Sequence, residues 1–221
     1  EIKVASGDIT KQEAGAIVVN LFEGVESPAG AAGAVDRALD GAISKLIEEG
    51  EAKGKRGELT LVHTLGKMAP SRVLVAGLGK KADFDVDRVR SVSAAACRYL
   101  RSRGVKEIAT VAHGAGVAGI DARESGQAVT EGAVLGLYRF DRHKSKDGSG
   151  RDIEALTIVE HDESKLSGLE AGVADGEVLA KAGFKPPGHY NMNNQQGGLL
   201  FALPREVPRP SRFGEEEAGF V

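Results

Sequence analysis

The chain has 221 residues, of which 41% are hydrophobic and 28% charged, and its net charge is −3. This length fits one domain with an appendage better than two full domains, and the composition predicts a packed core. No apolar run approaches the roughly 20 residues of a membrane span, and the charge gives no general signal for nucleic acid. The single cysteine, Cys97, cannot form an internal disulfide and has alanine neighbours, which predicts a buried helix position in a protein of the reducing cytoplasm.

The first elements alternate between strand and helix. Residues 2–6 predict a short strand, and the continuous apolar run 16–21 is typical of a strand covered on both faces. A loop rich in glycine and alanine is expected over residues 24–33. Residues 34–49 carry apolar side chains at helical spacing, so they predict one helix, with Gly50 as its stop.

The middle of the chain predicts three more strands. Two of them, residues 58–64 and 72–77, are separated by a turn. A helix that one of the aspartates at 83 and 85 can cap runs to about residue 103. The third strand follows at residues 107–112.

The last ordered elements repeat the alternation. A glycine-rich loop at residues 114–119 precedes a helix predicted over residues 122–140. A strand at residues 156–160 and a helix at 163–181 follow. Alternation of this kind predicts a three-layer α/β domain, with a mixed, largely parallel sheet flanked by helices.

The composition changes after residue 182. Residues 183–221 are rich in proline, asparagine and glutamine, with only residues 199–203 suited to one short strand. We therefore expect a domain over residues 1–182 and an extended C-terminal tail over 183–221 that forms no independent domain.

Five runs, in order and at family spacing, carry a resemblance to a known family. They are VNLFEG at 19–24, GAVDRALDGAI at 33–43, KGKRGE at 53–58, RVLVAGLGKK at 72–81 and EGAVLGLYRFD at 131–141. Together they resemble the macro-like N-terminal domain of the leucyl aminopeptidases, the cytosolic metal-dependent aminopeptidases, over residues 1–181.

The resemblance implies a two-domain hydrolase that releases N-terminal amino acids from peptides. Its C-terminal domain would bind two divalent metals, zinc or manganese, and activate a water. The hallmark run of that domain, Asn-Thr-Asp-Ala-Glu-Gly-Arg-Leu, does not occur in the 221 residues. No catalytic residue, metal ligand or cofactor is therefore carried over to this chain. The family would imply a cytoplasmic homo-oligomer in which this domain serves assembly.

The macro-like resemblance also implies a nucleotide site. Macro domains bind ADP-ribose through an acid that accepts from the adenine amine, and through glycine-rich loops whose backbone amides cradle the diphosphate. The candidate ligand-binding residues are Asp8, Asn20, Gly30, Gly33, Gly114, Gly116 and Gly119. The alternative is that Asp8 only caps a turn and the glycines only allow tight connections.

Other patterns predict less. Residues 77–82 fit the loose Gly-x-Gly-x-x-Ala pattern, but no acid ends the next strand, so we expect an ordinary strand-to-helix turn there. The five histidines lack metal-ligand spacing, and only His113 borders a glycine loop. Basic residues on the helix near residues 88–103 predict a solvated or subunit-contacting face more than a nucleic-acid site.

Three hypotheses remain open. In the first, the chain is a non-catalytic aminopeptidase N-terminal domain with an architectural or assembly role. In the second, it is a stand-alone macro-like module that binds ADP-ribose or a related nucleotide. In the third, it is part of a complete peptidase whose remaining sequence lies beyond Val221.

Overall fold

The computed structural model describes residues 1–115, 119–138 and 152–182. The predicted tail and its strand at 199–203 lie outside the described residues, as does residue 116. Within these residues six strands form one sheet: β1 (Ile2–Ser6), β2 (Ala16–Phe22), β3 (Leu59–His63), β4 (Arg72–Gly79), β5 (Glu107–Val111) and β6 (Ala155–Glu160). In the same described part of the chain, five α-helices flank the sheet: α1 (Gly30–Ala38), α2 (Ala42–Glu48), α3 (Val86–Ser102), α4 (Ala122–Leu137) and α5 (Leu166–Ala182).

The sheet is mixed and largely parallel, as predicted. Its strand order is β1-β6-β5-β2-β4-β3, and only β3, at one edge, pairs antiparallel. The central strand β2 lies with Ile17 opposite Val73 of β4 and Ala109 of β5. The apolar run of β2 is buried from residue 16 to residue 19, because parallel strands inside such a sheet are covered on both faces.

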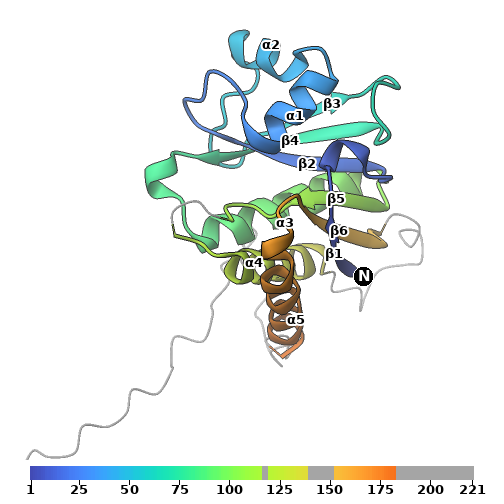
Figure 1. Cartoon of the computed structure of the whole chain (residues 1–221), viewed down its shortest axis with the longest axis vertical. Helices are drawn as coiled ribbons and strands as arrows, with labels where there is room; N and C mark the ends of the chain where they lie inside the picture. The colour runs from blue at the N-terminus through green and yellow to red at the C-terminus, as the bar shows by residue number, and fades with distance from the viewer. Residues whose placement is uncertain (116–118, 139–151, 183–221) are drawn as a thin grey trace, which may run out of the picture. The chain divides into compact units, whose positions relative to one another are not determined.

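Helices cover both faces of the sheet. Figure 1 shows α1 and α2 on one side of the strands and α3, α4 and α5 on the other. Two separate apolar cores match these layers. Val35 of α1 and Ile43 of α2 pack with Ile17 on one face, while Leu100 of α3 and Leu169 of α5 belong to the core on the other. The three-layer α/β prediction is therefore confirmed.

One predicted helix is two helices. The run 34–49 is broken by residues 39–41, where Asp40 and Gly41 have positive φ values of 55° and 82°. The cause is Asp36, whose Oδ1 accepts hydrogen bonds from the backbone N–H of Ile43 at 2.7 Å and Ser44 at 2.9 Å. This buried carboxylate caps the first turn of α2 and so stabilises a second helix start at this point.

Smaller differences concern element ends. The expected loop 24–33 is shorter, because α1 already begins at Gly30, and residues 77–79 end strand β4 rather than form a turn to a helix. The cap of α3 is Asp85, whose side chain accepts from the N–H of Arg88. A short 3-10 helix, η3 (Glu163–Lys165), precedes α5 where one continuous helix was expected. Helix α4 ends at Leu137, and residues 139–140 of the longer prediction lie outside the described part.

Helices α4 and α5 approach each other backbone to backbone. A side chain at Gly172 of α5 would overlap the carbonyl oxygen of Arg123, and one at Gly126 of α4 would come within 2.7 Å of the carbonyl oxygen of Leu169. Glycine lowers the stability of a helix interior, but at these positions it permits the close packing of α4 on α5.

Candidate functional site

Most of the candidate ligand residues gather at the carboxyl ends of the parallel strands. Asp8 follows β1, Asn20 lies near the end of β2, and the loop with Gly114 and Gly119 follows β5. The 3-10 helix η1 (Ile9–Lys11) leads the chain from Asp8 towards β2 and lies in contact with α1, which begins at Gly30. Five of the strands are parallel, so their carboxyl ends meet here, where ligands of open α/β sheets bind. The topology thus brings most of the predicted residues to the carboxyl ends of the parallel strands.

The carboxylate of Asp8 is engaged by its own chain. Its Oδ1 accepts from the backbone N–H of Thr10 at 2.9 Å and from the Thr10 hydroxyl at 2.7 Å. The hydrogen bond from the Thr10 backbone is the main reason why the pKa of Asp8 is lowered from its usual value. Asp8 is the N-cap of η1, so it does cap a turn, which was the alternative to a role in ligand binding. A role of Asp8 toward a nucleotide stays a prediction.

The side chain of Asn20 belongs to a buried polar chain. Its Oδ1 lies 2.8 Å from Nδ1 of His113, and Nε2 of that ring lies 3.0 Å from the hydroxyl of Thr110. With the amide oxygen as acceptor, Nδ1 carries the proton and Nε2 accepts from Thr110. His113 is 1% exposed, and burial lowers its pKa to about 4, so the ring is neutral at pH 7.

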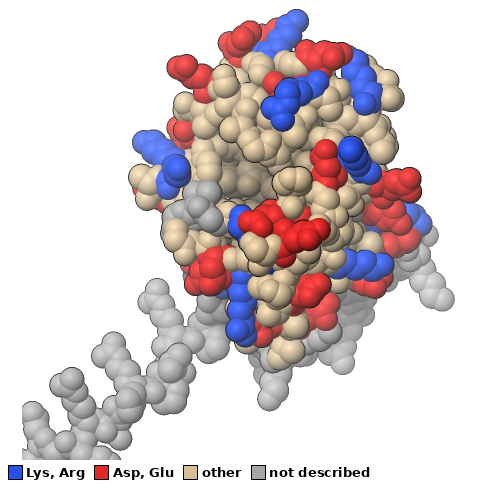
Figure 2. All heavy atoms as spheres, in the orientation of Figure 1, with Lys and Arg blue, Asp and Glu red and all other residues tan. Residues whose placement is uncertain are grey.

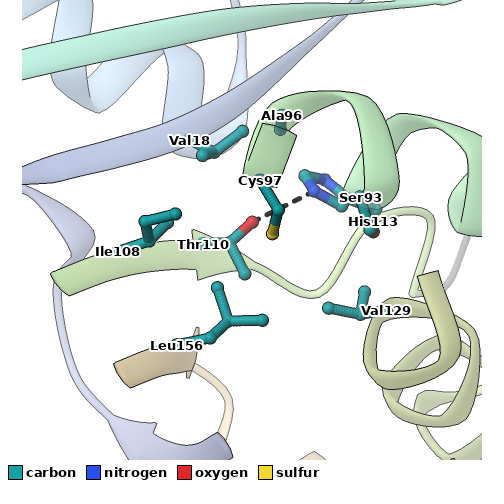
Figure 3. A pocket seen from close by; sticks show the side chains of 9 residues that line it. All are labelled: Val18, Ser93, Ala96, Cys97, Ile108, Thr110, His113, Val129 and Leu156. Atoms are coloured by element: carbon teal, nitrogen blue, oxygen red, sulfur yellow. Dashed lines mark hydrogen bonds between the residues drawn. The ribbon is translucent and has the colours of Figure 1, made fainter. Parts of the chain in front are cut away.

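A small cavity lies beside this ring (Figure 3). Its volume is about 10 Å³, near the least that can hold one water, so it cannot hold a nucleotide. Cys97 also lines it, and burial raises the pKa of that thiol to about 12. The thiol is therefore protonated and inert, which confirms the buried helix position predicted for it.

Gly114 serves an aromatic contact. Its φ is +78°, and a side chain there would come within 2.7 Å of Cζ of Phe84. The ring of Phe84 meets that of Phe22 edge to face, with centroids 5.2 Å apart. Phe84 therefore packs between Phe22, the last residue of β2, and Gly114, which follows β5.

The remaining candidate glycines differ in their surroundings. A side chain at Gly33 would come within 2.7 Å of the carbonyl oxygen of Pro28, which indicates a tight entry into α1. The space beside Gly30 and Gly119 is open. Their use by a ligand stays a prediction.

The described residues include no group of three or more His, Cys, Asp or Glu side chains placed to hold a metal ion. The same part of the chain has no helix that is long and apolar enough to cross a membrane. Figure 2 shows acidic and basic side chains scattered over one face of the molecule, around a hollow lined by uncharged atoms. Neither sign of charge dominates the face in this view.

Sequence reasoning missed most of the polar chain. Thr110 was not singled out, Phe84 was not noticed, and His113 was noted only for its place next to the glycine loop. A usable signal existed, because Asn20 lies near the end of one buried strand, His113 follows another, and the ends of neighbouring parallel strands meet. What the local pattern could not supply is that β2 and β5 are neighbours in the sheet.

A comparison with family models matches residues 18–147 to the cytosol aminopeptidase family, N-terminal domain. A probable cytosol aminopeptidase of Alkaliphilus oremlandii is 33% identical over 182 residues, which are 82% of this chain and 36% of that relative. One from Chromobacterium violaceum is 30% identical over 221 residues, covering 98% of this chain and 39% of the relative. The chain thus spans little more than a third of the length of these relatives.

Solved structures give the same picture of the fold. A tomato leucine aminopeptidase aligns with a TM-score of 0.63 and 20% identity, over 83% of this chain and 36% of the tomato chain. A macrodomain of Oceanobacillus iheyensis aligns with a TM-score of 0.61 and 15% identity, over 81% of this chain and 92% of the macrodomain. At such identities the likeness concerns the fold alone.

Proposed function

Because the chain belongs to the cytosol aminopeptidase family, whose N-terminal domain it matches, we propose that it acts as a non-catalytic, architectural domain of such an enzyme. In this role the domain provides a rigid α/β body that supports assembly. The parent activity would be the metal-dependent release of N-terminal amino acids from peptides.

The observation that carries the proposal is that polar side chains at the carboxyl ends of the strands make their hydrogen bonds within the domain. Asp8 caps η1 through Thr10, and Asn20 binds the ring of His113. Gly114 makes room for Phe84. Asp8, Asn20 and Gly114, three of the residues that a macro-type reader would offer to a ligand, thus make contacts within the domain itself.

The metals of the parent activity do not fit the described residues, which offer no cluster of three donor side chains. Zinc and manganese prefer such clusters of imidazole or carboxylate donors. No step of peptide hydrolysis is therefore assigned to a residue of this chain.

An assembly role is supported by exposed apolar side chains on α5. Val178 is 65% exposed and Leu179, the next residue, is 50% exposed near the end of the helix. Large apolar side chains that are adjacent and exposed are typical of contact surfaces. We propose self-association in the cytoplasm, the compartment named in the relatives' description. Analytical ultracentrifugation should show a concentration-dependent increase in mass that Val178→Asp reduces; a monomer at all concentrations would contradict assembly.

The catalytic side is tested by incubating the purified chain with leucine p-nitroanilide and added manganese or zinc. We expect no release of p-nitroaniline above the metal-only control. Turnover that is proportional to the concentration of the chain, and that a chelator abolishes, would overturn the non-catalytic role.

A further inference from the structure

The strand β3 forms one open edge of the sheet, and β1 forms the opposite edge (Figure 1). In the described part of the chain β3 pairs with β4 alone. Two hydrogen bonds that flank β3 show which of its residues face β4. The N–H of Gly77 donates to the carbonyl oxygen of Glu58 at 2.8 Å, and the N–H of Thr64 donates to the carbonyl oxygen of Ser71 at 3.1 Å. Even-numbered residues of this strand therefore direct their backbone groups toward β4.

The odd-numbered residues of β3 direct their backbone groups away from the sheet. These residues are Leu59, Leu61 and His63. Among the described residues, no loop, helix or side chain makes a hydrogen bond to the backbone N–H or C=O of any of the three. Such a row of unpaired backbone groups is a template for a further strand.

The sequence of β3 does not guard this edge. The strand reads Leu-Thr-Leu-Val-His, with no charged residue of the Lys, Arg, Asp or Glu type and no proline, and its register with β4 has no bulge. Lysine, proline and bulges are common means by which an edge strand avoids a neighbour. The opposite edge differs, because β1 carries Lys3, which pairs with Glu1 at 3.1 Å. The edge at β3 is therefore the one that is open to strand addition.

Residues just outside β3 extend this surface. Leu65, two residues after the strand, is 88% exposed and has a φ of 50°, a conformation that costs energy for leucine. Gly57, two residues before the strand, has a φ of +78° and open space where a side chain would point. A large apolar side chain and an open position thus flank the strand at equal distances from its central residue, Leu61.

We propose that β3 pairs antiparallel with β3 of a second copy of this chain, around a twofold axis at Leu61. In this register Leu61 faces Leu61 of the second copy, and Leu59 faces His63. Each outward N–H then meets an outward C=O, because odd-numbered residues face odd-numbered residues throughout. The inference rests on the self-association proposed above and names a contact surface for it.

A second copy fits this edge because the segment is its own complement. The twofold register brings Leu65 toward Gly57 of the second copy, where the space is open. Glu58 is the one residue of the Lys, Arg, Asp or Glu type between positions 57 and 65, and it lies opposite Thr64. No like charges therefore face each other, which favours pairing between identical strands.

The test is amide hydrogen exchange of the isotopically labelled full chain, measured by NMR in a dilute and in a concentrated sample. The outward amides of Leu59, Leu61 and His63 should exchange more slowly in the concentrated sample. The amides of Thr60 and Val62, which face β4, should be protected equally in both samples and serve as an internal reference.

Proline substitution on each edge supplies a matched pair of variants. The N–H of Leu61 faces outward, so Leu61→Pro keeps the bonds to β4 but removes a donor from each copy. The association constant should fall by about tenfold or more, because each copy loses a hydrogen bond. Val4→Pro is the control on β1, where hydrogen bonds from Leu156 to Glu1 and from Gly7 to Glu160 leave the N–H of Val4 outward. It should associate as the parent does.

Two further variants keep the test decisive. Leu65→Asn changes an exposed residue outside the strand and suits the left-handed backbone, so it remains informative if Leu61→Pro fails to fold. It should weaken association without changing the fold. Val178→Asp removes the α5 contact only, so it should leave a dimer in which the outward amides of β3 stay protected.

The outcomes separate the alternatives. Concentration-dependent protection of the outward amides, lost in Leu61→Pro or Leu65→Asn and kept in Val4→Pro, supports the proposal. Association that leaves these amides unprotected would overturn it, while the assembly role would stand on another surface such as α5. A monomer at every concentration would overturn both. Protection that appears only when a peptide of alternating threonine and valine is added would assign the edge to another extended partner and would also overturn self-pairing.

Discussion

The buried ring of His113 predicts that the domain loses stability in mild acid. An unfolded chain binds a proton on this histidine near pH 6.5, whereas burial lowers the pKa in the folded protein to about 4. The stabilising contribution of the neutral ring is fully present above pH 6.5 and is lost as the pH falls toward 4. The difference between the two pKa values corresponds to about 3 kcal/mol of unfolding free energy.

The structure supports a loss of stability in acid because the groups around the ring are neutral. Nδ1 faces the amide of Asn20, and Nε2 faces the hydroxyl of Thr110. The titratable group that shares the cavity is Cys97, which is neutral in the same pH range because its pKa is raised to about 12. No carboxylate among the cavity-lining residues is available to compensate a charged imidazolium.

Urea unfolding, followed by circular dichroism at several pH values between 7 and 4, measures the effect. The variant His113→Gln keeps a neutral polar side chain but does not titrate, so it is the matched control. Both proteins share the carboxylates with lowered pKa values, such as Asp8 and Asp162, whose contributions cancel in the comparison. We expect the stability of the parent to fall more steeply than that of the variant. Equal pH dependence in both proteins would refute the reasoning.

Three further predictions concern stability, each measured by urea unfolding at pH 7. Gly172→Ala should cost about 1–3 kcal/mol, because the new methyl group would overlap the carbonyl of Arg123; a cost near zero would mean that α4 and α5 can separate freely. Asp36→Ala should cost about 1–2 kcal/mol by removing the cap of α2, and unchanged stability would show that the helix break has another cause. Leu65→Gly should stabilise the domain by about 0.5–1 kcal/mol, because Leu65 is 88% exposed and has a φ of 50° at a hairpin turn; a loss would contradict strain there.

Local patterns predicted the strands well because each strand buries a continuous or alternating apolar run. The run 16–21 became β2, and its neighbours in the sequence became strands within one or two residues of the expected bounds. The prediction of one helix over residues 34–49 was wrong because a side chain of the first half caps a second helix in the other half. Asp36 points its carboxylate seven residues ahead to cap Ile43, and the periodicity of apolar residues does not record such a bond.

The sequence identified some residues of the candidate site but not the contacts that they make. Asp8 and Asn20, both singled out in the sequence, do lie at the carboxyl ends of parallel strands. Their partners depended on contacts between distant segments: Asn20 and His113 are brought together by the pairing of β2 with β5. The packing of Phe84 on Gly114 had no sequence signal, because it depends on where η2 places the ring.

The central claim is that the residues at the carboxyl ends of the parallel strands serve the architecture of the domain and not a nucleotide. Isothermal titration calorimetry of the full chain with ADP-ribose, at high protein concentration, tests it most directly. The account predicts no saturable heat, and the same baseline for the parent and for Asp8→Ala. Micromolar binding by the parent that is lost in Asp8→Ala would contradict the account and make the chain a macro-like reader of ADP-ribose.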